Sequence, residues 1–438
     1  MYFIAVDLGA TYIKSCLVES KNFSISAVHR ERFPEKETNF EVIFAVVRRV
    51  LDFQLKGITG CAGIFFSNQM HGVCLANSNG EIVSPFISWQ DQRCAVKGTT
   101  GISSFEKIQK LFDGFSWELE TGEYLRVGFP ITQLFHLKCE GALTPGLTPI
   151  DLGNAVAGRL ARVSVFKIDA SNASAMGCYD LKNGAWHESL IAGLGLSDLE
   201  WPEIVESHQT HGSITHQGKT VPVYLSVGDQ QASLLGAGLR ACNQISCNIA
   251  TGSQVSILSG ALAPGDFQTR PYFGKYLRTI THIPAGRSLN ALLRLFLELN
   301  PGLDFDAAWE RVGQLVEKTL PDDSLEFDLS FFPSAFGSSG HLNGLTEKNL
   351  NIGNLMQAAL RALAKAHQRG FQRLIIGQDH SFVEILGSGG VLKKSIFLQK
   401  VLKQQFDLSL QLSPQLEDAL IGNALRAKQS QASESFFT

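Results

Sequence analysis

Apolar residues occur in two patterns along this chain, short continuous runs and longer stretches with helical spacing. Together these patterns are typical of an α/β protein. Residues 2–19 hold two apolar runs on either side of a polar turn at Asp7–Thr11, and this predicts two strands joined by a turn. Residues 39–53 carry apolar side chains at helical spacing, which predicts a helix. Its apolar face would consist of Phe40, Ile43, Phe44, Val47 and Leu51.

Further strand and helix signals follow along the chain. Residues 63–66 form a short apolar run of the kind found in buried strands, and polar residues follow it at once. Residues 355–366 have helical spacing, residues 385–391 predict a strand that runs into a glycine loop, and residues 417–425 predict the last helix. Ligands of open α/β sheets bind beyond the carboxyl ends of the strands, so the polar residues after position 66 are candidate ligand contacts.

A second strand–turn–strand pattern surrounds Thr251–Ser253 in the later half of the chain. Residues 212–222, which alternate apolar and polar side chains between glycines, predict a hairpin and a connection before it. A chain of 438 residues is too long for one ordinary core. We therefore expect two α/β domains, residues 1–222 and residues 223–438, that face one cleft.

The composition argues against several classes of function. The formal net charge is −3 and the charges are not clustered, which disfavours a nucleic-acid surface or a polybasic membrane anchor. No apolar run reaches the ~18 residues that a membrane helix needs, and the start of the chain lacks the pattern of a signal peptide. The eight cysteines are scattered without a Cys-x-x-Cys pair, which disfavours a disulfide framework or a zinc site. We expect a cytoplasmic monomer or homodimer that binds neither nucleic acid nor membrane.

Asp229 is the first candidate for chemistry. It follows an apolar run and Gly228, and a helix-like segment begins at Gln230. A carboxylate in this place can take a proton from a substrate hydroxyl that lies within ~2.6–3.2 Å. The same residue can instead simply cap the helix that follows it. The pattern of residues leaves both interpretations open.

The two glycine turns are candidate phosphate sites. Backbone N–H groups in such turns suit phosphate oxygens, and a carboxylate such as Asp7 can hold Mg²⁺ through water. The hydroxyls of Thr251 and Ser253 add possible hydrogen-bond donors. Asp, Gly and Ser are also common in ordinary turns, so each turn by itself is weak evidence for a ligand site.

Several short motifs occur in a fixed order and together carry a family resemblance. They are Asp7–Thr11, Asn68-Gln-Met-His-Gly72, Trp89-Gln-Asp-Gln-Arg-Cys94, Gly228-Asp-Gln-Gln-Ala-Ser233, Thr251-Gly-Ser253 and Gly387-Ser-Gly-Gly390. In this order they resemble the FGGY family of carbohydrate kinases, and within it most closely the sedoheptulokinases. The resemblance extends from Asp7 to about Leu425. It implies the two-domain α/β fold of actin and hexokinase, which is ribonuclease H-like with a central cleft, and the transfer of phosphate from ATP, with Mg²⁺, to a small sugar.

The resemblance also assigns roles to single residues. Asp229 would be the general base, and Asp7 would bind the metal. The residues expected to contact ATP are Asp7, Gly9, Thr11, Lys14, Thr251, Gly252, Ser253, Gly389, Gly390 and Asn423. The residues expected to contact the sugar are Gln69, Met70, His71, Trp89, Asp91, Arg93, Asp229 and Gln230. Ala10 departs from the family, whose members often carry a hydroxyl residue there, and this removes one possible phosphate contact.

The substrate expected from the resemblance is sedoheptulose, which would become its 7-phosphate, and the next candidate is xylulose or another ketose or polyol. Two other classes of function stay open. One is an ATPase that drives a conformational cycle, as in the heat-shock branch of this fold, but the polar cluster at residues 69–93 argues against it. The other is a sugar sensor without catalysis, and the presence of Asp7, Asp229 and Thr251 argues against that.

Overall fold

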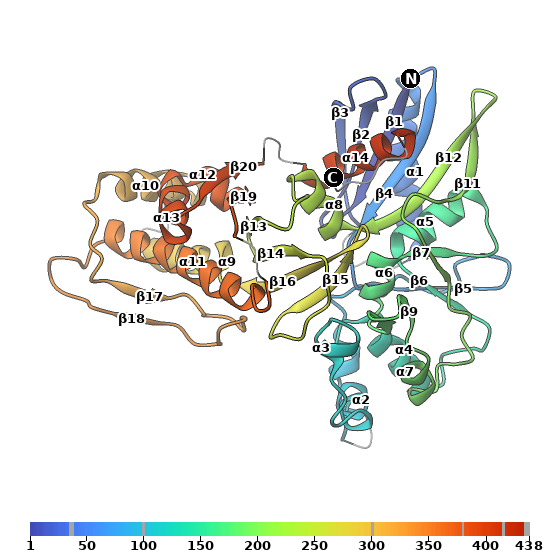
Figure 1. Cartoon of the computed structure of the whole chain (residues 1–438), viewed down its shortest axis with the longest axis horizontal. Coiled ribbons are helices and arrows are strands. Elements are labelled where there is room, and N and C mark those ends of the chain that lie inside the picture. Colours follow the sequence, from blue (N-terminus) through green and yellow to red (C-terminus); the bar gives the residue numbers. More distant parts are fainter. Residues whose placement is uncertain (35–38, 99–100, 299–301, 379–380, 414–416, 433–438) are drawn as a thin grey trace. The chain divides into compact units, whose positions relative to one another are not determined.

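The computed structural model of the chain describes residues 1–34, 39–98, 101–298, 302–378, 381–413 and 417–432. The chain divides into two compact units, and each is built around one six-stranded sheet (Figure 1). The first unit consists of Met1–Gly236, Thr269–Tyr276 and Glu417–Thr438, and the second of Ala237–Gln268 and Leu277–Leu416. In the described part of the chain, no helix has both the length and the apolar character that crossing a membrane requires.

The sheet of the first unit is mixed, with a parallel centre and antiparallel edges. Its strands, from edge to edge, are β11 (Thr210–His216), β12 (Lys219–Gly228), β4 (Cys61–Asn68), β1 (Tyr2–Leu8), β2 (Tyr12–Glu19) and β3 (Ile25–Arg32). β12, β4 and β1 are parallel to one another, whereas β2 and β3 follow β1 as antiparallel neighbours. The three parallel strands therefore present their carboxyl ends at the same edge of the sheet.

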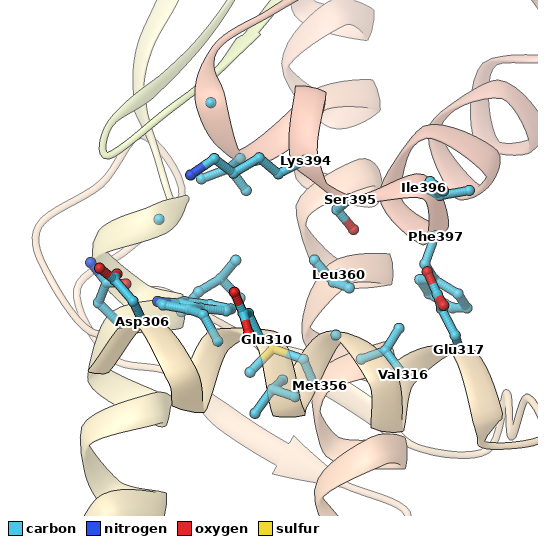
Figure 2. Close-up of a pocket in the computed structure, with 18 of the residues that line it drawn as sticks. Asp306, Glu310, Val316, Glu317, Met356, Leu360, Lys394, Ser395, Ile396 and Phe397 are labelled. Carbon is cyan, nitrogen blue, oxygen red and sulfur yellow. The ribbon is translucent and has the colours of Figure 1, made fainter. Parts of the chain in front are cut away.

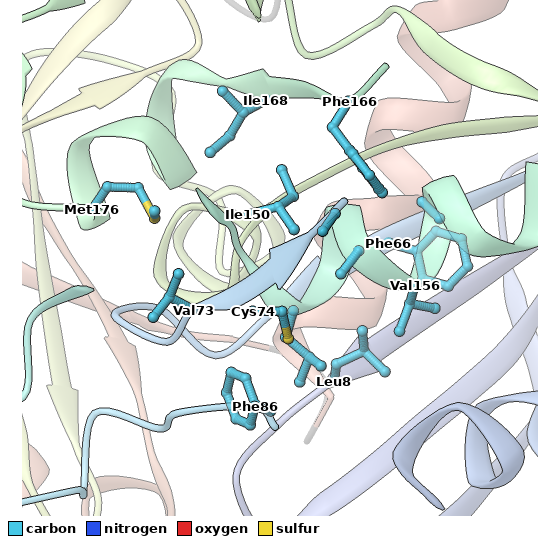
Figure 3. Packing of buried hydrophobic residues seen from close by; sticks show 14 of the residues in the cluster. Leu8, Phe66, Val73, Cys74, Phe86, Ile150, Val156, Phe166, Ile168 and Met176 are labelled. Atoms are coloured by element: carbon cyan, nitrogen blue, oxygen red, sulfur yellow. The ribbon is translucent and has the colours of Figure 1, made fainter. Parts of the chain in front are cut away.

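The side chains of β1 alternate between two hydrophobic cores, one on each face of this sheet. Ile4, Val6 and Leu8 join the large core that also buries one face of helix α1 (Phe40–Lys56), as the helical spacing predicts. Figure 3 shows part of this core around Leu8, Phe66 and Val156. Phe3 and Ala5 point the other way and pack with helix α14 (Asp418–Ala432). Both faces of the sheet are thus covered, which explains why its central strands are nearly continuous apolar runs.

The other elements of the first unit surround this sheet. Its remaining helices are α2 (Ser104–Leu111), α3 (Trp117–Glu120), α4 (Pro130–Cys139), α5 (Leu152–Ala161), α6 (Ala170–Ala175), α7 (Glu188–Gly193) and α8 (Asp229–Gly236), with a 3₁₀ turn at Arg93–Ala95. Three small sheets pair β5 (Cys74–Ala76) with β6 (Thr148–Ile150), β7 (Lys167–Asp169) with β10 (Glu203–Val205), and β8 (Tyr179–Asp180) with β9 (Ala185–Trp186).

The second unit repeats the same plan. The second six-stranded sheet runs in the order β15 (Gln268–Tyr272), β16 (Lys275–Ile283), β14 (Ser253–Ser259), β13 (Gln244–Ile249), β19 (Glu384–Ser388) and β20 (Ser409–Leu412). Most of β15 and the start of β16 consist of residues Thr269–Tyr276, which are grouped with the first unit. The helices of the second unit are α9 (Gly286–Leu297), α10 (Phe305–Lys318), α11 (Ile352–Leu374), α12 (Gly390–Lys394) and α13 (Ile396–Phe406), and β17 (Glu326–Asp328) pairs with β18 (His341–Asn343). As in the first unit, an antiparallel hairpin is followed by two parallel strands on its other side.

The division between the units differs from the predicted boundary at residue 222. That residue lies inside β12, a strand of the first sheet, and the first unit continues to Gly236. The last helix, α14, also belongs to the first unit, although it comes at the end of the chain. A pattern of local periodicity identifies a helix but not the sheet against which it packs, and this is why the boundary was misplaced.

Candidate active site

The carboxyl ends of the three parallel strands in the first unit bring predicted site residues together. In the register of these strands, Asp7 of β1 lies beside Ser67 of β4, and Gly228 of β12 lies beside Asn68. Asp229 follows directly as the first residue of α8. The fold therefore places Asp7 and Asp229, which are far apart in the sequence, at one edge of the sheet.

These two carboxyl groups influence each other. Burial raises the pKa of Asp229, and the nearby Asp7 carboxylate raises it further, to about 7. Burial also raises the pKa of Asp7, against the lowering effects of Lys14 and of a 2.9 Å hydrogen bond from the Ser67 hydroxyl. A carboxyl group with a pKa near neutrality can accept a proton efficiently at physiological pH.

The Asp229 carboxylate also forms a hydrogen bond at the N-terminus of α8, the helix that begins with this residue. Its carboxylate accepts a hydrogen bond from the backbone N–H of Gln230, which lowers its pKa but less than burial raises it. The hydrogen bond at the helix start and a raised pKa thus occur in one residue, so the role of Asp229 as a general base stays a prediction. The helix start fixes the direction of the carboxylate, and its surroundings supply the basicity.

The turn after β4 carries Gln69, Met70 and His71 to the same edge of the sheet. His71 has a φ of 63°, which is uncommon for a residue other than glycine. Its ring stacks on Phe129 with 4.5 Å between centroids, and its Nδ1 lies 3.1 Å from the Ala175 carbonyl oxygen. Because a carbonyl only accepts, Nδ1 carries the hydrogen. Burial lowers the pKa of His71 to about 4, so the ring is neutral and Nε2 is a hydrogen-bond acceptor.

A buried ion pair that the sequence did not indicate lies beside these residues. Glu123 is 0 % exposed and Arg270 is 5 % exposed, and Arg270 Nε lies 2.5 Å from Glu123 Oε1. Arg270 also donates through Nη1 to the side-chain oxygen of Gln230, and its Nη2 lies 3.5 Å from Nε2 of His71. No local motif could have identified this pair, because 147 positions separate its members.

Three other predicted sugar contacts lie on the loop after β5. Trp89 is 44 % exposed, and Arg93 donates to Asp91 with 2.9 Å from Nε and 2.7 Å from Nη2 to the same oxygen. This pairing lowers the pKa of Asp91 against the opposing effect of burial. The guanidinium of Arg93 is thus already bonded to its own loop, and a sugar contact by these three residues remains a prediction.

The first glycine turn is exposed at Thr11 and carries Lys14 on the strand that follows. Lys14 lies opposite Asp7 in the hairpin, and its Nζ is 2.7 Å from Glu417 Oε2. The backbone N–H of Gly9 donates to the Tyr12 carbonyl and closes the turn. The predicted phosphate contact of Lys14 would therefore compete with an existing ion pair.

The carboxylates at this edge suit Mg²⁺. No group of three or more His, Cys, Asp or Glu side chains within the described ranges could hold a metal. Mg²⁺ usually takes only one or two protein carboxylates and completes its shell with water and substrate phosphates. The Asp7 carboxylate supplies such an oxygen donor, so the residues fit the metal that the family implies.

The second glycine turn presents one hydroxyl and uses the other within the core. Thr251 and Gly252 are exposed, and a side chain at Gly252 would meet open space. Ser253 is buried and contacts Nε2 of His367, whose Nδ1 lies 2.6 Å from the Leu363 carbonyl oxygen. Since burial lowers the pKa of His367 to about 4, this Nε2 accepts the proton of the Ser253 hydroxyl. The Ser253 hydroxyl is thus already used within the core, and its contact with a phosphate remains a prediction, whereas Thr251 is exposed.

A pocket of about 930 Å³ lies beside this turn within the second unit (Figure 2). Its volume is typical of a site for a small ligand. Apolar side chains form much of the lining, including Trp309, Met356, Leu360 and Phe397, and its charged groups include Glu310 and Lys394. The remaining residues around the pocket are Ala250, Thr251, Gly286, Leu289, Asn290, Asp306, Val312, Gly313, Val316, Glu317, Gly390, Val391, Ser395 and Ile396.

The glycine loop after β19 reaches this pocket with one of its two predicted residues. Gly390 lines the pocket and begins α12. Gly389 has a φ of 88°, and a Cβ atom there would lie 2.4 Å from the carbonyl oxygen of Ile249. Gly389 is thus required for the close packing of the loop on β13, which positions Gly390.

Asn423 does not lie in the unit that contains this pocket. It is a fully buried residue of α14 in the first unit, and its side-chain amide donates to the Val6 carbonyl at 3.2 Å and to the Ser67 hydroxyl at 3.0 Å. A contact of this side chain with ATP remains a prediction. Asn423 supports the hydroxyl that in turn bonds Asp7.

Comparisons with known proteins agree with this arrangement. The sequence model of the FGGY family of carbohydrate kinases, N-terminal domain, matches residues 2–236. An apulose kinase of Pectobacterium atrosepticum is 24% identical over 283 residues, which cover 58% of this chain and 53% of that protein. A glycerol kinase of Marinomonas sp. is 24% identical over 410 residues, which cover 83% of this chain and 77% of that protein. The match thus spans about half the length of the apulose kinase.

Solved structures resemble the whole chain. A gluconate kinase from Lactobacillus acidophilus has a TM-score of 0.85 at 18% identity, over 99% of this chain and 90% of that one. A ligand-bound xylulose kinase from the same organism has a TM-score of 0.84 at 19% identity, with the same coverage. This likeness confirms the predicted fold class, the two-domain α/β fold of actin and hexokinase. Because the match to the family model covers more than half of the sequence, the chain belongs to the FGGY family of carbohydrate kinases.

Proposed function

We propose that this protein transfers the terminal phosphate of ATP to a primary hydroxyl of a small sugar or polyol. The observation that carries the proposal is Asp229, a carboxylate held at a strand end with its pKa raised to about 7 by burial and by Asp7. A general base for a sugar hydroxyl needs such a carboxylate. His71 and Gln230 supply the polar groups that hydroxyls would meet beside it.

The acceptor hydroxyl would give its proton to the Asp229 carboxylate as its oxygen attacks the terminal phosphorus. The new oxygen–phosphorus bond forms while the bond to the leaving ADP oxygen breaks, and the proton on Asp229 later passes to water. Asp7 would hold Mg²⁺, which when bound neutralises charge on the transferred phosphoryl group. The His71 ring would lie beside the sugar, with its Nδ1 bonded to Ala175 and its Nε2 facing Arg270, and Met70 would form an apolar wall.

The nucleotide would occupy the 930 Å³ pocket of the second unit. Its apolar lining, with Trp309 and Phe397, suits a flat base. The open Thr251–Gly252 turn at the same pocket offers a hydroxyl and room for a phosphate to approach. Gly390 would let the nucleotide lie close to the backbone of α12.

We propose sedoheptulose as the first candidate substrate, on the resemblance of the motifs. A xylulose-like ketose or another polyol is the second, since relatives and structural neighbours are named as kinases of apulose, glycerol, gluconate and xylulose. The chain covers only about half of the first of these relatives, so the choice among acceptors rests on the experiment.

A coupled assay of ADP release with a panel of ketoses and polyols tests the proposed function. We expect ADP release that depends on one or two acceptors and a phosphorylated sugar as the second product, with sedoheptulose giving the highest kcat/KM. ADP release without any acceptor would favour the ATPase interpretation. Sugar binding by titration calorimetry without turnover would favour a sensor.

A further inference from the structure

The buried ion pair of Glu123 and Arg270 has no role in the chemistry described so far. Arg270 approaches Glu123 with two nitrogens, Nε at 2.5 Å from Oε1 and Nη2 at 3.2 Å from Oε2. Of these two approaches, the one from Nη2 is a hydrogen bond, and the one from Nε is an ion-pair contact. A buried ion pair is weak evidence for stability, because removing two charges from water offsets their attraction. The pair is therefore better explained by what it holds in place.

The other atoms of the guanidinium face two of the predicted sugar contacts. Nη1 donates to the side-chain oxygen of Gln230, which fixes which way the amide of this residue points. Nη2 lies 3.5 Å from Nε2 of His71, the nitrogen that carries no hydrogen. Met70 also lies close, with its sulfur 4.0 Å from Nη1. Arg270 thus contacts all three residues from one side.

Hydrogen bonds hold the backbone beside Arg270 and the backbone beside Glu123 in place. Thr269 donates its N–H to the carbonyl of Gly122 at 2.8 Å, and the Gln231 side chain donates to the Pro271 carbonyl at 3.2 Å. Gly122 has a φ of 74°, and a Cβ atom there would lie 2.0 Å from the Thr269 carbonyl oxygen. Only glycine allows this close approach, so the segment that carries Arg270 is locked against the loop that carries Glu123.

Two further residues near the pair contribute to its electrostatics. Arg126, on the Glu123 loop, has its pKa lowered first by burial, with Glu123 opposing this effect and Arg270 adding to it. Arg270 also lowers the pKa of Asp229 against the effect of burial. Glu123 therefore lies between two cations, and removing it would leave both of them partly uncompensated.

We propose that Arg270, held by Glu123, is a positioning residue of the acceptor site, and that it acts through Gln230 and His71. It sets the Gln230 amide in one orientation, and it faces the acceptor nitrogen of His71. The sugar then meets a Gln230 amide and a His71 ring that are already in place, which lowers the entropy lost on binding. This inference rests on the proposed function, because it concerns the same acceptor site.

The first test compares Michaelis constants for the acceptor and for ATP in two variants. Arg270→Gln leaves Glu123 buried without its partner and can unfold the protein. The double variant Glu123→Gln with Arg270→Gln removes both charges of the pair and leaves no buried Glu123 carboxylate without its partner. It therefore keeps the test valid if Arg270→Gln alone does not fold. We expect the KM of the acceptor to rise about tenfold or more in the folded variant, with the KM of ATP changed less than about twofold. Glu31→Gln with Arg49→Gln, which removes an exposed ion pair of the same unit, should change neither constant.

The second test separates positioning from general support of the fold. In a Gln230→Ala background, the pair of substitutions should raise the acceptor KM by less than about threefold, since one of the groups that Arg270 orients is gone. An unchanged acceptor KM in the folded double variant would overturn the inference. Fully additive effects with Gln230→Ala, or equal increases in both Michaelis constants, would do the same.

Acceptor binding by titration calorimetry distinguishes this inference from the proposed function. Weaker binding of the sugar by the double variant than by the wild type supports the inference, whether or not turnover is detected. Turnover by the wild type, together with unchanged sugar binding in the double variant, contradicts the inference and leaves the proposed function intact. A wild-type protein that neither binds nor phosphorylates any sugar of the panel overturns both.

Discussion

The two units share one order of strands but differ in charge at the turn between their first two strands. In the first unit, Asp7 of β1 lies opposite Lys14 of β2. At the matching place in the second unit, Asn248 of β13 lies opposite Gln254 of β14. The same backbone plan therefore carries a charged pair in one unit and a neutral pair in the other.

The surroundings of the two turns differ in the same sense. The first turn lies near the carboxyl of Asp229, whose pKa the Asp7 carboxylate raises. The second turn lies beside a pocket with a largely apolar lining that also includes the carboxylates of Asp306, Glu310 and Glu317. A carboxylate at a strand end is useful where a proton or a metal ion must be held. The comparison agrees with our proposal that the first unit carries the proton chemistry and that the second holds the nucleotide pocket.

The largest effect is expected from Asp229→Asn, which removes an acidic group from the charged site of the first unit. The amide keeps the size of the side chain and its hydrogen bond to Gln230 but cannot take a proton. We expect kcat to fall by ~10²–10⁴, while the ATP dissociation constant stays within about twofold. The coupled ADP assay measures kcat, and calorimetry with an ATP analogue measures the dissociation constant of the nucleotide. Near-normal turnover would leave Asp229 with only its role at the start of α8.

The pH dependence of the wild type should show the next largest effect. A general base works in its ionised form, and the pKa of Asp229 is raised to about 7. We therefore expect kcat/KM for the acceptor to rise about tenfold per pH unit below pH 7 and to level off above it, so that about 1% remains at pH 5. A profile that is flat between pH 5 and 8 would contradict a base with this pKa.

Thr251→Val tests the neutral turn of the second unit. The substitution keeps the shape of the side chain but removes the exposed hydroxyl that we expect to contact a phosphate. A hydrogen bond to a charged group contributes ~1.5–3 kcal/mol, so the KM of ATP should rise by about tenfold or more. The acceptor KM and the pH profile should stay as in the wild type. A change confined to the acceptor would mean that the two sites are exchanged.

Asn423→Ala should have the smallest effect on kinetics and a clear effect on stability. Its amide bonds Val6 and Ser67 in the core of the first unit, so its loss leaves buried groups without partners. We expect a loss of ~1–3 kcal/mol in the free energy of unfolding of this unit, with the KM of ATP unchanged. Denaturant unfolding and the coupled assay give both values. A stable variant with weak ATP binding would restore the role in ATP binding that the sequence predicted for Asn423.

Local patterns were sufficient to locate the strand ends and the turns. The apolar runs before Asp7, Gln69 and Asp229 predicted strands that the structure contains, and the rule that ligands bind at strand ends then indicated the edge of the sheet where these residues lie together. Short-range information also identified α1, because its apolar face repeats at helical spacing.

Contacts between distant parts of the chain could not be derived in this way. Glu123 and Arg270 are 147 positions apart and meet only through the packing of two loops, so neither forms a motif. Helical spacing of apolar residues predicts the helix that contains Asn423. The partners of the Asn423 side chain depend on which sheet this helix covers, and the spacing does not show that. The contact between Ser253 and His367 was not predicted for a similar reason, since His367 comes from a helix 114 positions further on.

The most direct test of the account measures two constants in two variants, the turnover number and the ATP dissociation constant of Asp229→Asn and of Thr251→Val. The account predicts a crossed result: Asp229→Asn loses turnover and keeps its affinity for ATP, whereas Thr251→Val loses affinity for ATP and keeps most of its turnover at saturating ATP. If both variants change both constants to the same extent, or if the pattern is reversed, the assignment of proton chemistry to the first unit and nucleotide binding to the second is wrong.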